Sequence, residues 1–139
     1  MQIGKYIHAK LSAAAPVTAI VGTGANARIT PVFLPHGTSG TGIVYLVKSQ
    51  PHGIGKVEEG THIRSTVTLH LWADVSQGAE AYPVLETLNL AVYDALNYVD
   101  ATAGGVTVES CRHIETSDGR DEQNMYFLKT AVYEIVHRR

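Results

Sequence analysis

The sequence predicts an α+β fold: a mostly antiparallel sheet of about four to five strands packed against an N-terminal helix and one long central helix. Two observations predict it. Helical periodicity is confined to the N-terminus and the middle of the chain, and the segments with strand character are not separated by a helix each. The 139 residues suffice for one hydrophobic core but hardly for two, so residues 1–139 are expected to form a single domain.

The composition narrows the class of protein. Apolar residues make up 45% of the chain, which is ordinary for a globular protein. The net charge of −2 argues against a basic stripe, so no sequence-specific nucleic acid is expected as a partner. One cysteine cannot form an internal disulfide, and no apolar run approaches the ~20 residues of a membrane span. A soluble protein that folds in a reducing cytoplasm is expected.

The N-terminus has helical spacing. Ile3, Ile7 and Leu11 recur every four residues and form one apolar stripe. Pro16 limits this helix, and residues 17–21 suggest one more short turn.

Strand signals follow. Residues 28–34 contain a proline and suit an irregular or edge strand, and residues 43–48 form a β-branched and aromatic strand. Residues 50–60 are rich in glycine and charge and are interpreted as a flexible loop. The clearest strand is 62–74, because apolar residues occupy one face and polar residues the other.

The second half of the chain holds one long helix and a hairpin. The helix is expected over residues 76–97. Either its regular part starts near Tyr82, with Pro83 at the first helical position, or an earlier turn is kinked at Pro83. Strands are expected over 106–115 and 124–137, joined by a polar hairpin turn over 116–123. The apolar stripe of the helix comprises Leu85, Leu88, Val92 and Leu96.

Glycine-rich segments resemble nucleotide-binding loops only superficially. Residues 22–27 match a relaxed dinucleotide fingerprint, but prolines follow at once and no acidic residue occurs before Glu58. Residues 37–42 lack the lysine of a phosphate-binding loop, and residues 53–56 lack its upstream glycine. Thr41 stands where a nucleophile elbow around Ser39 needs glycine. No cofactor is expected.

Two other kinds of chemical site are weaker alternatives, a metal or enzyme site and an acid–base site. Cys111 and His113 share a strand face and could give two metal ligands, whereas His62 and His70 lie about 26 Å apart on one strand and cannot share a metal. A small enzyme or ligand-binding domain with a site near Cys111 and His113 is therefore an alternative function. The charged side chains of the expected hairpin turn are interpreted as exposed to solvent. A pair of carboxylates there could alternatively serve in acid–base catalysis. The charged residues are Asp118, Arg120, Asp121 and Glu122.

An ordered series of segments resembles the siphophage tail-completion or tail-terminator proteins, which also occur in prophages and gene transfer agents. The most specific feature is Val67-Thr68-Leu69-His70-Leu71-Trp72-Ala73-Asp74, a strand that leads directly into the long helix. The other features are Leu11-Ser12-Ala13, Val17 to Gly22, Arg28-Ile29, Ile43-Val44-Tyr45 and Tyr133-Glu134-Ile135-Val136.

The resemblance implies a virion protein at the head–tail interface, assembled in the host bacterial cytoplasm. It implies a ring, expected to be a hexamer, that ends the tail tube and docks it to a head-side connector or stopper protein, with DNA passing through. It implies no catalytic residues, cofactor or metal, so the chain is not expected to be an enzyme. Another neck or tail component, such as an adaptor or tube-like subunit, is an alternative.

A ring subunit needs surfaces that its neighbours can cover. The candidates are the polar strand face over 62–74, the loop over 50–60 and the terminal strand. Trp72 stands on that polar face and is expected either to pack beneath the end of the long helix or to anchor an interface. The predicted interface residues are His52, Lys56, Glu58, Glu59, His62, Arg64, His70 and Trp72.

Overall fold

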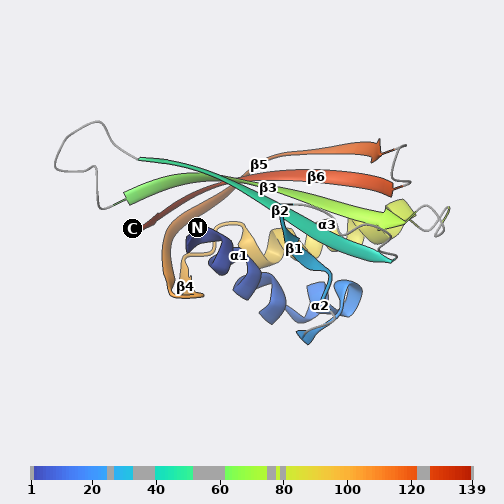
Figure 1. Ribbon diagram of the computed structural model, residues 1–139, viewed down its shortest axis with the longest axis horizontal. Coiled ribbons are helices and arrows are strands. Elements are labelled where there is room, and N and C mark those ends of the chain that lie inside the picture. Colours follow the sequence, from blue (N-terminus) through green and yellow to red (C-terminus); the bar gives the residue numbers. More distant parts are fainter. Residues whose placement is uncertain are drawn as a thin grey trace.

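The computed structural model describes residues 2–24, 27–32, 40–51, 62–74, 78, 81–121 and 126–138. Within them, three helices lie against one face of a six-stranded sheet (Figure 1). We call the helix-covered side of the sheet the inner face and the opposite side the outer face. No helix in these residues is long and apolar enough to cross a membrane.

Two helices open the described chain. α1 (Gln2–Ala13) and α2 (Ala15–Val21) are separated by Ala14, whose backbone is extended. Pro16 stands in the first turn of α2, where its missing N–H breaks no helical hydrogen bond. Gly22 ends α2 with a φ of 94°, a conformation that glycine adopts without steric cost. The short turn expected after Pro16 is therefore a helix of its own.

The long helix is α3 (Ala81–Leu96). Pro83 lies in the first turn of α3. This agrees with the alternative in which the regular helix starts near Tyr82. Residues 76, 77, 79 and 80 of the longer expected helix lie outside the described residues. Its buried side chains are Ala81, Leu85, Leu88, Ala91, Val92 and Leu96, which include the whole predicted stripe.

The sheet has the strand order β1-β2-β3-β6-β5-β4. Only the β1–β2 pair is parallel, and the other four pairs are antiparallel. β3 spans the thirteen residues that the sequence predicted as its clearest strand. The strands are β1 (Ile29–Pro31), β2 (Thr41–Pro51), β3 (His62–Asp74), β4 (Ala101–Ala103), β5 (Val106–Asp121) and β6 (Tyr126–Arg138).

The predicted count of four to five strands is too low. β4 was missed because its three residues are too few to show a period; Gly104 and Gly105, both with positive φ, join it to β5. The turn predicted over 116–123 is wrong for 116–121, which continue β5. This stretch is polar on both faces because it lies at the border of the sheet, so it lacks the alternation that marks a half-buried strand. Residues 122–125 lie outside the described residues.

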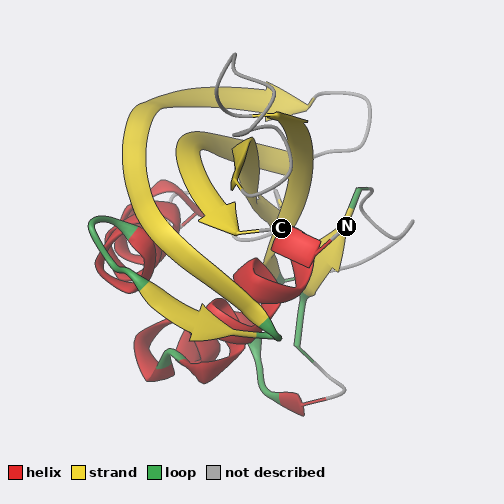
Figure 2. Ribbon diagram, turned by 90° about the vertical axis from the view of Figure 1, so that its left-hand side faces the viewer, coloured by secondary structure: helices red, strands yellow, loops and turns green. Residues whose placement is uncertain are grey.

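The core lies between the helices and the inner face. Odd-numbered residues of β3 and β6 point into it, with Val67, Leu69 and Leu71 fully buried. β5 has irregularities between Val108 and Ser110 and between His113 and Glu115. Bulges bend a strand, and β5 curves away from the sheet so that β4 lies beside the N-terminal half of α1 (Figures 1 and 2).

Candidate assembly surfaces

Three predicted interface residues lie on one sheet face. Arg64, His70 and Trp72 are even-numbered residues of β3, so they point to the outer face, opposite the residues that contact the helices. The polar strand face expected from the sequence is therefore the face without helices. The role of these residues in an interface stays a prediction.

Trp72 is packed within the chain. Its side chain is 2% exposed and forms a small outer-face cluster with Val44, Tyr126 and Leu128. The rings of Trp72 and Tyr126 meet edge to face, with centroids 5.2 Å apart. The expectation that Trp72 packs beneath the long helix is wrong, because its side chain points away from the face that α3 covers.

His70 and Arg64 are half-buried on the same face. His70 Nδ1 lies 3.0 Å from Thr130 Oγ1 of β6. Burial lowers the pKa of His70, which favours the neutral imidazole. Arg64 Nε is buried and has no hydrogen-bond partner among the described residues. These two side chains contribute hydrogen-bonding capacity to a face that also carries Lys48 of β2 and Glu134 of β6.

The remaining predicted contacts cannot be placed. His52, Lys56, Glu58 and Glu59 lie outside the described residues. The backbone of His62 begins β3, and its side chain lies outside the described residues.

Cys111 and His113 share the inner face of β5, as predicted, but are engaged in packing. Cys111 is buried, and burial raises the pKa of its thiol to about 12. A protonated thiol is a poor metal ligand. His113 Nε2 lies 2.6 Å from Thr116 Oγ1, and its ring contacts Tyr93 and Tyr133 edge to face. Within the described residues, no three His, Cys, Asp or Glu side chains come together as a metal site.

A buried lysine, which sequence reasoning missed, holds two carboxylates. Lys129 Nζ lies 2.6 Å from Glu86 Oε1 of α3 and 2.6 Å from Asp118 Oδ1 of β5. Burial lowers the pKa of Lys129, but its hydrogen bonds and charge interactions with Asp118 and Glu86 outweigh this, and the pKa is raised overall. Asp118 is thus part of an ion-pair cluster that fastens α3 to the sheet. A sequence signal existed, since Lys129 interrupts the apolar inner-face residues of β6.

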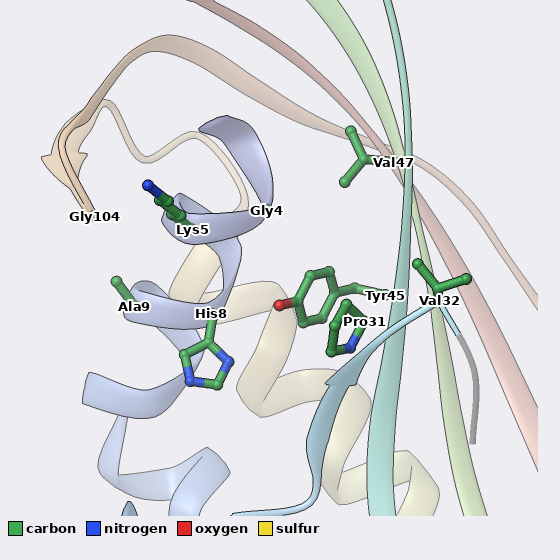
Figure 3. Close-up of a pocket in the computed structure, with 9 residues that line it drawn as sticks. All are labelled: Gly4, Lys5, His8, Ala9, Pro31, Val32, Tyr45, Val47 and Gly104. Carbon is green, nitrogen blue, oxygen red and sulfur yellow. The ribbon is translucent and has the colours of Figure 1, made fainter. Parts of the chain in front are cut away.

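An apolar groove with a volume of about 760 Å³ lies beside the β1–β2 edge (Figure 3). We call it the α1–β2 groove; its main lining residues are Lys5, His8, Pro31, Val32, Tyr45 and Val47. Val32 is 68% exposed and has a φ of 69°, which is unusual for a β-branched residue. The sequence could not indicate this groove, because α1, β1 and β2 meet only through the topology.

Exposed apolar side chains gather at the opposite edge of the sheet. Tyr82, Leu90 and Tyr93 recur along one side of α3 and form what we call the α3 stripe. The hydroxyl of Tyr82 donates to Gly119 O, which holds the stripe beside β5. In the described part of the chain, every exposed large hydrophobic residue except Val32 lies on α3, on β5 or just after α3.

The comparisons with known proteins concern the whole fold. No family model and no curated protein matches the chain. Chains of solved structures do match. Among them is a chain of the virion of a native gene transfer agent particle, which matches with a TM-score of 0.75 and 17% sequence identity, covering 99% of this chain and 98% of that chain. At this identity the match shows a shared fold.

Proposed function

We propose that this chain is a structural protein of a phage-like particle that terminates the tail tube and joins it to the head as a ring-shaped oligomer. Its partners are copies of itself, the tail tube protein and a head-side connector or stopper protein. Its place is the head–tail junction of the virion, after assembly in the bacterial cytoplasm. DNA passes through the ring without being read in sequence.

The observation that carries this proposal is the end-to-end match in fold to a chain of a gene transfer agent virion. The likeness concerns the whole domain, since the match covers 99% of this chain and 98% of the other. The arrangement of surfaces supports the proposal as well. The α1–β2 groove and the α3 stripe are different surfaces at opposite sheet edges, which is what a head-to-tail ring contact requires.

The chemistry of the described residues points the same way. Cys111 is buried and protonated, His113 is held between two tyrosine rings, and Lys129 is neutralised by two carboxylates. Each of these groups is engaged with neighbours in the fold. An assembly role, in which the protein acts through its contact surfaces, suits such a chain better than catalysis does.

Electron microscopy and mass photometry of the purified protein test the proposal. Annular particles of one defined mass are expected, alone or with the tail tube protein. In a strain that makes the particle, deletion of the gene is expected to give separate heads and tails, and the gene supplied in trans restores joined particles. Joined, normal particles from the deletion strain would refute the proposal.

A further inference from the structure

Charge is divided along the chain. The first 57 residues hold five of the eleven basic residues and none of the thirteen acidic ones, a formal charge of +5. The rest of the chain holds thirteen acidic and six basic residues, a formal charge of −7. Within it, residues 81–111 contain four acidic residues and no lysine, arginine or histidine. The net charge of −2 therefore conceals two segments of opposite sign.

The fold places the two segments at different edges of the sheet. The cationic segment supplies α1, α2, β1 and β2, and the pair β1–β2 stands at one end of the strand order. The acidic segment supplies α3, β4 and the start of β5, and the pair β5–β4 stands at the other end. Subunits set side by side in the same orientation would bring a cationic edge to an acidic one.

The charged side chains are exposed beside the two apolar surfaces. Lys5 lines the α1–β2 groove, and Lys48 is exposed on β2 at the same edge. Asp94 is exposed one helical turn after Leu90 of the α3 stripe, and Asp100 is exposed just after α3. Each apolar surface thus has a charged rim, cationic at the groove and acidic at the stripe.

Other charged groups near the stripe leave its sign unchanged. Glu86 and Asp118 share the single ammonium of Lys129, so this cluster keeps one negative charge. Arg120 lies over the ring of Phe127, beside the first turn of α3 and about two turns from the middle of the stripe. The rim around Leu90 therefore stays acidic.

The signs of the two rims favour one way of pairing copies. A two-fold contact sets a surface against its own copy, which would place an acidic rim on an acidic rim or a cationic rim on a cationic one. Like charges across a contact are costly. A head-to-tail contact instead places the acidic rim on the cationic rim and the apolar stripe on the apolar groove.

We propose that the α3 stripe of a second copy of this chain occupies the α1–β2 groove, with the acidic rim of one copy against the cationic rim of the other. The contact rests on the proposed ring function and specifies which surfaces meet. Leu90 and Tyr93 enter the groove, and Asp94 and Asp100 lie toward the cationic rim. The exposed charges select the partner surface, and the buried apolar area holds it.

Reversing the charge of one rim tests the contact. Lys5→Glu/Lys48→Glu makes both edges acidic, and Asp94→Lys/Asp100→Lys makes both edges cationic. Both chains should fold, because the four side chains are exposed, and circular dichroism checks this. At low salt each is expected to assemble about tenfold more weakly than the wild type by mass photometry.

A mixture of the two variants separates rim pairing from general repulsion. Every contact in the mixture can join an acidic edge of one variant to a cationic edge of the other, so assembly returns. The chain with all four changes also has complementary edges and assembles alone. Asp94→Lys/Asp100→Lys changes the formal charge from −2 to +2, so its weaker assembly has no origin in a larger net charge.

Neutral replacements serve if a reversed chain does not fold. Lys5→Gln/Lys48→Gln and Asp94→Asn/Asp100→Asn each remove one rim. The wild-type oligomer is expected to weaken between about 0.05 M and about 0.5 M NaCl, because salt screens exposed charges. Each neutral variant is expected to show a smaller salt response than the wild type.

The outcomes separate the two proposals. The stripe-to-groove contact is overturned, and the ring function left standing, by reversed variants that assemble like the wild type or whose mixture assembles no better than either alone. Neutral variants that keep the full salt response of the wild type overturn it as well. A wild-type chain that stays monomeric, both alone and with the tube protein, overturns both proposals.

Discussion

Gly42 of β2 lies directly opposite Trp72 of β3, and the indole occupies the space above the glycine. A Cβ at Gly42 would stand 2.5 Å from Trp72 Cζ2 and 2.7 Å from the carbonyl oxygen of Arg28. The absence of a side chain at Gly42 thus allows the only tryptophan to fold down onto the outer face beside Tyr126.

Gly42→Ala should destabilise the protein by about 1–3 kcal/mol, because the new methyl group displaces either the indole or the backbone of Arg28. Urea unfolding followed by tryptophan fluorescence measures the loss. Gly119→Ala is the matched control, since it also adds a methyl group within a strand, and the nearest atom there is Leu128 Cβ at 4.0 Å. Equal losses in both variants would contradict the close fit at Trp72.

Removing the two carboxylates that pair with Lys129 should destabilise the protein more than removing the charge of Lys129 itself. Its side chain is 6% exposed, whereas those of Glu86 and Asp118 are each 60% exposed, so water can solvate the carboxylates but not the ammonium. We expect Glu86→Ala with Asp118→Ala to cost about 2–3 kcal/mol and Lys129→Met to cost less. Chemical denaturation of the three proteins checks this order. The opposite order would mean that the lysine stem, and not its charge, holds α3 to the sheet.

How far the sequence predicts this fold depends on pattern length. β3 and the buried side of α3 were found because thirteen alternating residues and four turns of helix each show a clear period. β4 and the end of β5 were missed because three residues show no period and an exposed border strand needs no apolar face.

The candidate surfaces were less predictable than the fold. The sequence indicated the outer-face residues of β3, because alternation within one strand is local. The α1–β2 groove joins residues from α1, β1, β2 and the turn between β4 and β5. The α3 stripe is a candidate contact surface because α3 lies beside β5. Surfaces that depend on which segments meet in space leave no local signal.

The buried thiol of Cys111 should make the protein sensitive to alkali. Its pKa in the folded state is raised from 9.0 to about 12 by burial, so between those values the unfolded chain holds fewer protons than the folded one. Stability is then complete below the unfolded pKa and falls by about 1 kcal/mol per pH unit as the pH rises above it. The stability gap between wild type and Cys111→Ala should therefore shrink from pH 7 to pH 10. A constant gap would contradict the shift, as would rapid native-state reaction with a thiol reagent.

Removing the side chain of Val32 should stabilise the protein. Its φ of 69° places a β-branched residue in the left-handed region, at a cost of about 1–2 kcal/mol, and its 68% exposure leaves little packing to lose. We expect Val32→Gly to raise the free energy of unfolding by about 1 kcal/mol, whereas Val32→Ala keeps the Cβ and gains nothing. A thermal melt of the two variants distinguishes them. An equal gain in both would show that exposure of the valine, and not its backbone, is the source.

Leu90 should matter for assembly and not for folding. It is 61% exposed in the middle of the α3 stripe, so Leu90→Lys removes little buried surface from the monomer and leaves its unfolding free energy within about 0.5 kcal/mol. In the assembled protein the added charge would lie in an apolar contact, where burying it without a partner is costly. We expect at least a tenfold weaker oligomer by mass photometry. Ser12→Lys adds the same charge to an exposed position on α1, away from the α3 stripe and outside the lining of the α1–β2 groove, and should assemble normally. If both variants assemble alike, the stripe lies outside the contact between subunits.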